Sequence, residues 1–302
     1  MEVKGVAILL VILCSLFSNA VCRVIDHNAT NYTSDKINVE IQVQKHPDFG
    51  LEENGYPLHK DHCHAVVRTR TNDAKRFFGT QASLSLYKPK VLSNQWSSSR
   101  LKLLNGDESI EAGWMVNPEV FKDDESHLYT KFFAGAKGCI NTQCPGFVVQ
   151  VPNILGYVPE TYSQVRGDQW TWNITIKKHQ DDGNWWFSIM EQHGTEVLVG
   201  YWPKTLFTSL AEVASQVEWG GEINNPGASN VHPEMGSGVV ATYSTRLSAF
   251  FQQVTIVNES FQKVQPDDTE KDADCSPYYE ALDRDSHDAY WGRLIFFGGT
   301  HG

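Results

Sequence analysis

Short apolar runs that alternate with polar residues are the feature that most limits the folds open to this chain. They recur from residue 81 to the C-terminus, and turn-forming Gly, Pro, Asp and Asn residues separate them. Alternation with a period of two is typical of strands that bury one face. The clearest runs are residues 81–87, 146–151, 170–176, 185–189 and 291–297. They predict an all-β protein, an antiparallel β-sandwich of jelly-roll or lectin type.

Two segments differ from this pattern. Residues 203–214 begin with a proline and carry apolar residues on one side, which predicts one short helix. The acidic residues 265–274 predict a surface loop before the closing strand.

The N-terminal residues predict export. Lys4 precedes an apolar run over residues 6–17 that is too short to cross a bilayer, and small residues follow it. This pattern predicts a secretory signal peptide over residues 1–22. Residues 23–75 are polar, and we expect them to form a leader or shortened pro-segment ahead of a folded domain over residues 76–302. The mature chain is then secreted and extracellular.

The sequons and the cysteines agree with export. Asn-x-Ser/Thr sequons predict glycosylation at Asn28, Asn31, Asn173 and Asn258. Beyond the signal region the cysteines are Cys63, Cys139, Cys144 and Cys275. Cys139 and Cys144 close a small ring that suits a disulfide-bonded turn, and Cys63 and Cys275 remain as the default second pair.

A cluster of histidines surrounds Cys63. With His59, His62 and His64 it offers zinc-binding residue types, but one thiolate and neighbours that point opposite ways in an extended chain make a poor ligand set. We expect no metal and no cofactor.

The formal net charge of −11 bears on partners. An acidic chain without a stripe of Lys or Arg repels a phosphate backbone, which argues against nucleic acid and anionic membranes. We expect a monomer.

Two stretches place carboxylates beside Trp and Gly in apolar, strand-like runs. One contains Glu111 and Trp114, and the other contains Glu218, Trp219 and Glu222. An ionised side chain in such a run costs several kcal/mol unless a partner or a function requires it. The glutamates therefore indicate acid chemistry, and we expect Trp114 and Trp219 to form flat walls of a substrate cleft.

Seven motifs occur in the same order as in the neprosin family of plant secreted proteins, which this chain resembles from about residue 81 onward. They are residues 111–118, 138–147, 183–186, 200–203, 218–223, 235–238 and 297–299. The resemblance implies a glutamic peptidase that acts on peptides or proteins, cleaves after proline in acid and is made with an activation segment. It assigns catalysis to Glu111 and Glu222. Residues 128–133 depart from the family's usual aromatic strand.

Glu218 competes with Glu222 for the second catalytic position. In an unbroken strand the two share a face with residue 220, but Gly220 and Gly221 predict a bulge that would re-aim one of them. The resemblance favours Glu222. We expect the Glu111/Glu222 pair to share a proton and to work best in acid. Neither base nor acid can be assigned from sequence, and no spacing selects an oxyanion donor.

Two other functions fit parts of this pattern. A glycosidase also uses two carboxylates, often with tryptophan platforms. A non-catalytic extracellular binding module could retain the same sandwich.

Overall fold

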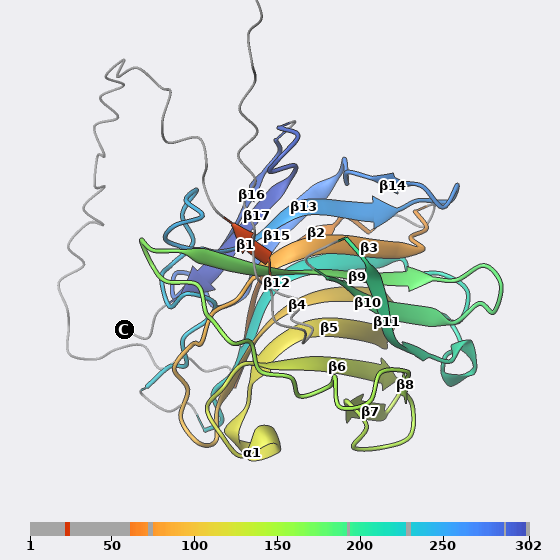
Figure 1. Ribbon diagram of the computed structural model, residues 1–302, viewed down its shortest axis with the longest axis horizontal. Coiled ribbons are helices and arrows are strands. Elements are labelled where there is room, and N and C mark those ends of the chain that lie inside the picture. Colours follow the sequence, from red (N-terminus) through yellow and green to blue (C-terminus); the bar gives the residue numbers. More distant parts are fainter. Residues whose placement is uncertain are drawn as a thin grey trace, which may run out of the picture.

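The computed structural model describes residues 22–24, 61–71, 75–191, 194–227, 231–286 and 288–299. Within them two sheets face each other, and every pairing of named strands is antiparallel (Figure 1). The predicted antiparallel β-sandwich is confirmed.

The larger sheet, sheet A, has the strand order β16-β17-β13-β3-β9-β10-β11-β8, with β1 paired to β9 and β14 to β13. Its strands are β1 Cys22–Val24, β3 Gly79–Ser85, β8 Val148–Val149, β9 Gln169–Lys178, β10 Trp185–Met190, β11 Glu196–Trp202, β13 Ala249–Val257, β14 Lys263–Val264, β16 Tyr279–Arg284 and β17 Leu294–Gly299. The run expected over residues 146–151 forms only the two residues of β8.

The smaller sheet, sheet B, has the order β15-β2-β12-β4-β5-β6-β7. Its strands are β2 His62–Thr69, β4 Trp96–Asn105, β5 Glu108–Val116, β6 His127–Ala134, β7 Lys137–Ile140, β12 Gln216–Asn224 and β15 Thr269–Ala273. All three candidate glutamates lie on this sheet, on β5 and β12.

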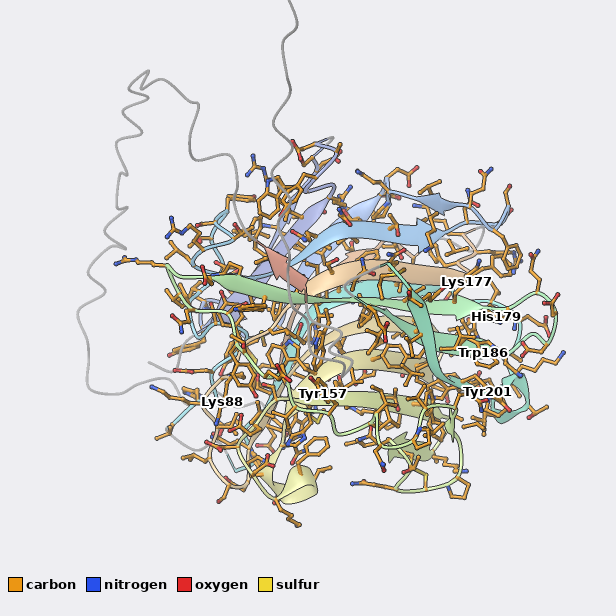
Figure 2. All side chains as sticks on the ribbon, viewed as in Figure 1. Lys88, Tyr157, Lys177, His179, Trp186 and Tyr201 are labelled. Carbon is orange, nitrogen blue, oxygen red and sulfur yellow. A yellow bond between two sulfur atoms is a disulfide. The ribbon has the colours of Figure 1, made fainter. Side chains whose placement is uncertain are left out.

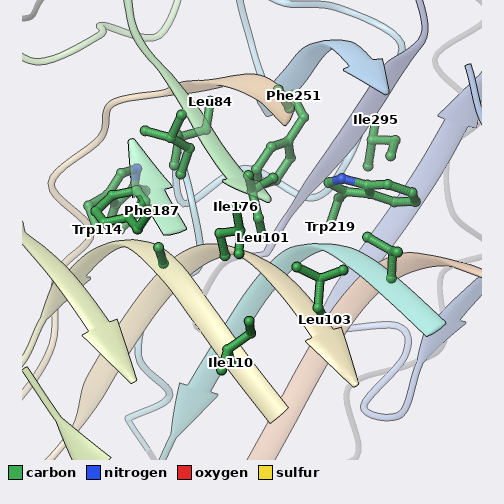
Figure 3. Packing of buried hydrophobic residues seen from close by; sticks show 14 of the residues in the cluster. Leu84, Leu101, Leu103, Ile110, Trp114, Ile176, Phe187, Trp219, Phe251 and Ile295 are labelled. Carbon is green, nitrogen blue, oxygen red and sulfur yellow. The ribbon is translucent and has the colours of Figure 1, made fainter. Parts of the chain in front are cut away.

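The core fills the space between the two sheets. Close packing there involves large aromatic and branched side chains, several of which Figure 3 shows. Trp114 of β5 donates its indole N–H to the carbonyl of Ser85 at 2.9 Å, and Trp219 of β12 donates to the hydroxyl of Thr80 at 2.9 Å. Both acceptors belong to β3 of sheet A, so these two indoles bridge the layers and satisfy their only polar group inside.

The outer face of sheet A carries a row of aromatic rings. Trp186 of β10 lies 4.7 Å from the ring of Tyr201 and 5.0 Å from that of His179 (Figure 2). The rings of Trp186, Tyr201 and His179 therefore pack against one another.

The one α-helix among the described residues lies elsewhere than predicted. Helix α1 spans Pro118–Phe121, where the Asn117 side chain accepts the N–H groups of Glu119 and Val120. The helix expected over residues 203–214 is wrong, because only the 3-10 turn η1 Lys204–Leu206 forms there.

The carboxylate of Glu108 explains this difference. It accepts the backbone N–H groups of Thr208 and Leu210 at 2.8 Å each, and both would be interior donors of the expected helix. A side chain from β5 thus captures backbone groups that the helix would need.

The sandwich begins earlier than the boundary expected at residue 75. Strand β2 pairs with β12 on one side and with β15 on the other, and it buries Cys63, Ala65 and Val67. The segment assigned to a leader therefore contributes an interior strand of sheet B. Its alternation was obscured by the histidines on the opposite face.

The acidic stretch expected to be a loop also contains a strand. Strand β15 lies at the edge of sheet B, and its Glu270 and Asp272 bind Arg68 of β2 at 3.0 and 2.8 Å. Cross-strand ion pairs make an acidic edge strand compatible with the sheet.

Two disulfides form as predicted, Cys63–Cys275 and Cys139–Cys144. Because the sulfur of Cys63 is bonded to Cys275, it is not a free thiolate beside the histidines. No helix in the described ranges is long and apolar enough to cross a bilayer.

The sequons fall in two groups. Asn28 and Asn31, like the expected signal peptide up to Val21, lie outside the described residues. Asn173 lies on β9 and accepts a hydrogen bond from Gln81, whereas the Asn258 side chain accepts backbone N–H groups in the turn after β13. Glycosylation at all four sites stays a prediction.

Candidate active site

The centre of the site is Arg100 on β4, which lies between β5 and β12. In the sheet register Arg100 is opposite Gly113 on one side and Gly220 on the other. A Cβ at Gly113 would lie 1.9 Å from the Ser99 carbonyl oxygen, and one at Gly220 would lie 2.2 Å from that of Ala65. Neither position can carry a side chain, so the nearest side chains in the row of Arg100 are those of Tyr129 on β6 and Val66 on β2.

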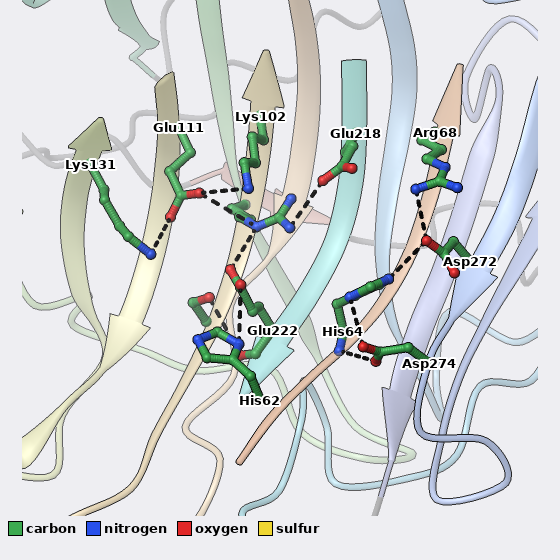
Figure 4. Close-up of polar contacts among 12 residues, drawn as sticks. His62, His64, Arg68, Lys102, Glu111, Lys131, Glu218, Glu222, Asp272 and Asp274 are labelled. Carbon is green, nitrogen blue, oxygen red and sulfur yellow. Dashed lines mark hydrogen bonds and ion pairs between the residues drawn. The ribbon is translucent and has the colours of Figure 1, made fainter. Parts of the chain in front are cut away.

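Three glutamates occupy the adjoining rows and contact this guanidinium. Its Nε lies 3.1 Å from Glu222 Oε2 and 3.7 Å from Glu111 Oε2, and its Nη2 lies 3.1 Å from Glu218 Oε2. The two expected catalytic glutamates therefore approach the same nitrogen atom from different strands. Figure 4 shows the three carboxylates converging on one region of the outer face of sheet B.

Glu222 lies at the more open side of this group, with 13% of its side chain exposed. Its Oε1 lies 3.4 Å from Nδ1 of His62, whose side chain is 51% exposed. Burial alone would raise the pKa of Glu222, but the charges of Arg100, Lys131, Lys102 and His62 hold it well below its usual range. These charges favour the ionised form of Glu222 below the usual pKa range of a glutamate.

Glu111 lies deeper, with 1% of its side chain exposed. Its Oε1 accepts a hydrogen bond from Tyr129 at 2.9 Å and lies 3.6 Å from the Lys131 ammonium, while Lys102 lies 3.9 Å from Oε2. Burial and then the negative charge of Glu111 raise the pKa of Tyr129, so this phenol stays protonated and donates.

Two polar atoms in this buried group have no hydrogen-bond partner among the described residues. They are Nη1 of Arg100 and Oε2 of Glu111. A buried donor and a buried acceptor left in this way cost free energy unless a ligand or another molecule satisfies them.

The bulge expected at Gly220 and Gly221 is absent. Strand β12 pairs with β4 and with β2 in continuous register from one end to the other. Glu218 and Glu222 therefore keep the same face, and both bind Arg100. Gly220 instead has a φ of 155°, a backbone conformation that residues with a side chain rarely adopt, and the strand keeps its register without an extra residue.

The expected role of Trp114 and Trp219 in a cleft is also wrong. Both side chains are fully buried between the sheets. Trp114 is three residues from Glu111, and Trp219 is one residue from Glu218 and three from Glu222. On a strand an odd spacing puts side chains on opposite faces, so the glutamates and the tryptophans point away from each other.

A second polar cluster adjoins the site on β2 and β15. His64 contacts Asp272 at 2.9 Å and Asp274 at 3.3 Å, and Arg68 also binds Asp272 (Figure 4). This cluster shares the outer face of sheet B.

Sequence reasoning missed the cations and the tyrosine of the site. Arg100 and Lys102 sit two residues apart in the run over residues 96–105, a spacing that places both on one face of a strand. Lys131 and Tyr129 lie in the stretch where the chain departs from the neprosin pattern. That departure was the available signal, since a lysine within an aromatic strand needs a buried anion nearby.

The fold and site together define a β-sandwich protein that groups glutamates around a buried arginine on one sheet face. The Neprosin family model matches residues 93–300, and the chain belongs to the Neprosin family. This membership supports a glutamic peptidase, as the motifs imply.

Among solved structures, the chain is similar to scytalido-glutamic peptidase bound to a peptide-based transition-state analogue, with 8% identity and a TM-score of 0.41, covering 81% of this chain and 99% of that one. A second structure of that peptidase, with a transition-state analogue inhibitor, gives 7% identity and a TM-score of 0.43, covering 80% and 99%. The chain is also similar to SCP-B, a member of the Eqolisin family of peptidases, in a complex with the tripeptide Ala-Ile-His. The identity is 8% and the TM-score is 0.40, and the match covers 81% of this chain and 99% of that one.

Proposed function

We propose that this protein is a secreted glutamic endopeptidase that cleaves proline-containing peptides in acid, with Glu222 as general base and Glu111 as general acid. The observation that carries the proposal is the approach of both carboxylates to one nitrogen of Arg100, at 3.1 and 3.7 Å. Two carboxyl groups so placed can act on the same peptide bond. The preference for proline rests on the family resemblance.

The contacts favour unequal roles for the two glutamates. The charges around Glu222 keep it ionised, and it lies beside the more exposed His62, where water can reach it. Glu111 lies deeper, and its Oε2 accepts no hydrogen bond from a described residue, so this oxygen is available to carry and deliver a proton. We therefore assign activation of water to Glu222 and protonation of the leaving nitrogen to Glu111, in place of one shared proton.

The alternative readings lose their main support. A glycosidase was favoured by tryptophans beside the carboxylates, but Trp114 and Trp219 are buried in the core and cannot stack on a sugar. A binding module would not require glutamates grouped at an internal arginine, which is costly to bury.

The test is to express the secreted protein and incubate it with a library of proline-containing peptides over acid to neutral pH, then map the products. A parallel incubation with plant polysaccharides tests the glycosidase reading. Cleavage on the carboxyl side of proline is the expected result. No peptide cleavage at any pH, after removal of the upstream segment, overturns the proposal.

A further inference from the structure

We propose that Arg100 is itself a catalytic residue, whose Nη1 donates a hydrogen bond to the scissile carbonyl oxygen and binds the oxyanion that forms when water attacks. This inference rests on the proposed peptidase function. It extends that function by giving the reaction an electrophile that neither glutamate can supply.

The first observation is how the guanidinium uses its donors. Nε is directed to Glu222 and Nη2 to Glu218, at 3.1 Å each, whereas Nη1 has no partner among the described residues. Arg100 is 2% exposed, so bulk water does not solvate this nitrogen freely. Two of the three nitrogens thus anchor the group, and the third remains available to bind an oxygen.

The second observation is the pair of glycines that flank Arg100 in sheet B. Gly113 and Gly220 flank Arg100 in the sheet register and cannot carry side chains. The two strands beside β4 therefore place no side chain of their own directly against Arg100, and the next residue in its row on the β5 side is Tyr129 of β6.

The third observation is the balance of charge. Arg100, Lys102 and Lys131 surround Glu111, and Arg100 also binds Glu218 and Glu222. Neighbouring carboxylates raise the pKa of Arg100 further, against the effect of burial, so it remains a cation at every working pH. A fixed cation at the point where negative charge develops stabilises the transition state more than the ground state.

A water oxygen bonds to the carbonyl carbon, one water proton passes to the Glu222 carboxylate, and the π electrons move to the carbonyl oxygen, which Nη1 of Arg100 binds. The intermediate then reforms its carbonyl, the carbon–nitrogen bond breaks, and the leaving nitrogen takes the proton of Glu111. The products are a carboxylic acid and an amine, and solvent returns a proton from Glu222 to Glu111.

The experiment separates the donor from the charge with two variants. Arg100→Lys keeps the cation but loses Nη1, and we expect kcat to fall about 100-fold to 1000-fold with KM changed less than about threefold and the acid limb of the pH profile unmoved. Arg100→Gln removes the cation, and we expect the acid limb to move to higher pH as well. Arg68→Lys is the matched control, because Arg68 binds two carboxylates on the same sheet face outside the site.

A second measurement does not depend on turnover. A phosphinate peptide, which carries an anionic oxygen at the tetrahedral centre, should bind wild type more tightly than Arg100→Lys by the same factor as the loss in kcat/KM. Circular dichroism and thermal unfolding establish that each variant folds. If Arg100→Lys is unfolded, the comparison is made with Arg100→Gln.

The outcomes distinguish this inference from the proposed function. Wild-type cleavage together with a folded Arg100→Lys that retains kcat and phosphinate binding overturns the inference alone. Wild-type protein that binds the phosphinate through Arg100 but cleaves no peptide overturns the proposed function and the catalytic role of Arg100, and leaves only its contact with the anionic oxygen. Wild-type protein that neither cleaves nor binds overturns both.

Discussion

Trp219 and Glu222 lie on the same strand, β12, yet they belong to opposite sides of sheet B. The indole of Trp219 donates to Thr80 inside the sandwich, and the carboxylate of Glu222 binds Arg100 on the outer face. The strand thus connects the hydrophobic core directly to the site. Loss of packing on one side and loss of chemistry on the other should therefore be separable by mutation.

Trp219→Phe tests the side that faces the core. The phenyl ring removes the hydrogen bond to Thr80 and part of the packing, and we expect a loss of about 2 kcal/mol in the free energy of unfolding. KM should stay within about twofold, because the ring does not touch substrate. Chemical denaturation and steady-state kinetics measure the two effects, with Trp186→Phe on the outer face of sheet A as the control. A raised KM with an unchanged free energy of unfolding would show that Trp219 contacts substrate, as expected from the sequence.

Glu222→Gln and Glu111→Gln test the chemistry. Each amide keeps the shape of the side chain and removes the titrating group, so we expect turnover to fall by at least about 1000-fold in either variant. Glu218→Gln is the control on the same strand and the same face. Its amide oxygen can still accept from Arg100 Nη2, so it should keep substantial activity, within about tenfold of wild type. An equal loss of turnover in Glu218→Gln and Glu222→Gln would show that catalysis requires all three carboxylates.

The acid limb of the pH–rate profile should lie below the ordinary glutamate pKa of 4.5. The base must be ionised, and the surrounding cations lower the pKa of Glu222, so activity persists as the pH falls. Lys131→Met removes one of these charges and should move the acid limb upward by up to about one pH unit. Lys177→Met, on sheet A, should leave it in place. An acid limb that does not move in Lys131→Met would contradict the electrostatic account.

Glu108 should govern stability in acid. Its carboxylate accepts hydrogen bonds from Thr208, Ser209 and Leu210, and although burial raises its pKa, these donors lower it to about 2. Because the folded-state pKa is depressed, the stabilisation is fully present above the ordinary value of 4.5 and is lost as the pH falls toward 2. We expect Glu108→Gln to lower the free energy of unfolding by about 2 kcal/mol near neutral pH. The loss should be much smaller near pH 2, where Glu108 of the wild type is itself becoming protonated. Urea unfolding at several pH values measures this, with the exposed Glu259→Gln as control.

The two disulfides should differ in their effect on stability. Cys63 and Cys275 are 212 residues apart in sequence, whereas Cys139 and Cys144 are separated by 5. The loss of chain entropy in the unfolded state predicts that the disulfide of the long loop stabilises the fold by roughly 5 kcal/mol and that of the short loop by about 2 kcal/mol. The double variant Cys63→Ser/Cys275→Ser should therefore unfold at a much lower temperature than Cys139→Ser/Cys144→Ser. Equal unfolding temperatures would show that loop length does not set the effect here.

The sandwich and the Cys139–Cys144 disulfide could be predicted from the sequence because alternation and close cysteine spacing act locally, and Cys63–Cys275 followed only as the remaining pair. The positions of Trp114 and Trp219 could also have been deduced, since an odd spacing from the glutamates puts them on the other face. The missing helix could not, because the carboxylate that captures the N–H groups of Thr208 and Leu210 comes from Glu108, a hundred residues away.

The position of Arg100 could not be predicted from the sequence for the same reason, because its partners Glu218 and Glu222 are distant along the chain. Its partners come from β5 and β12, and nothing in the sequence of β4 shows which strands flank it. The resemblance pointed to Glu111 and Glu222 as a pair, but only the sheet register shows that an arginine lies between them. The lowered pKa of Glu222 follows from the position of that arginine.

The placement of β2 sets an inner limit on any proteolytic trimming of this chain. The strand lies next to β12, carries the His62 that contacts Glu222, and is fastened to Cys275 through Cys63. A cut upstream of Asp61 can release what precedes it and leave sheet B whole. A cut after Thr69 would make β2 part of a separate chain. Its disulfide and its backbone hydrogen bonds to β12 would still hold His62 beside Glu222.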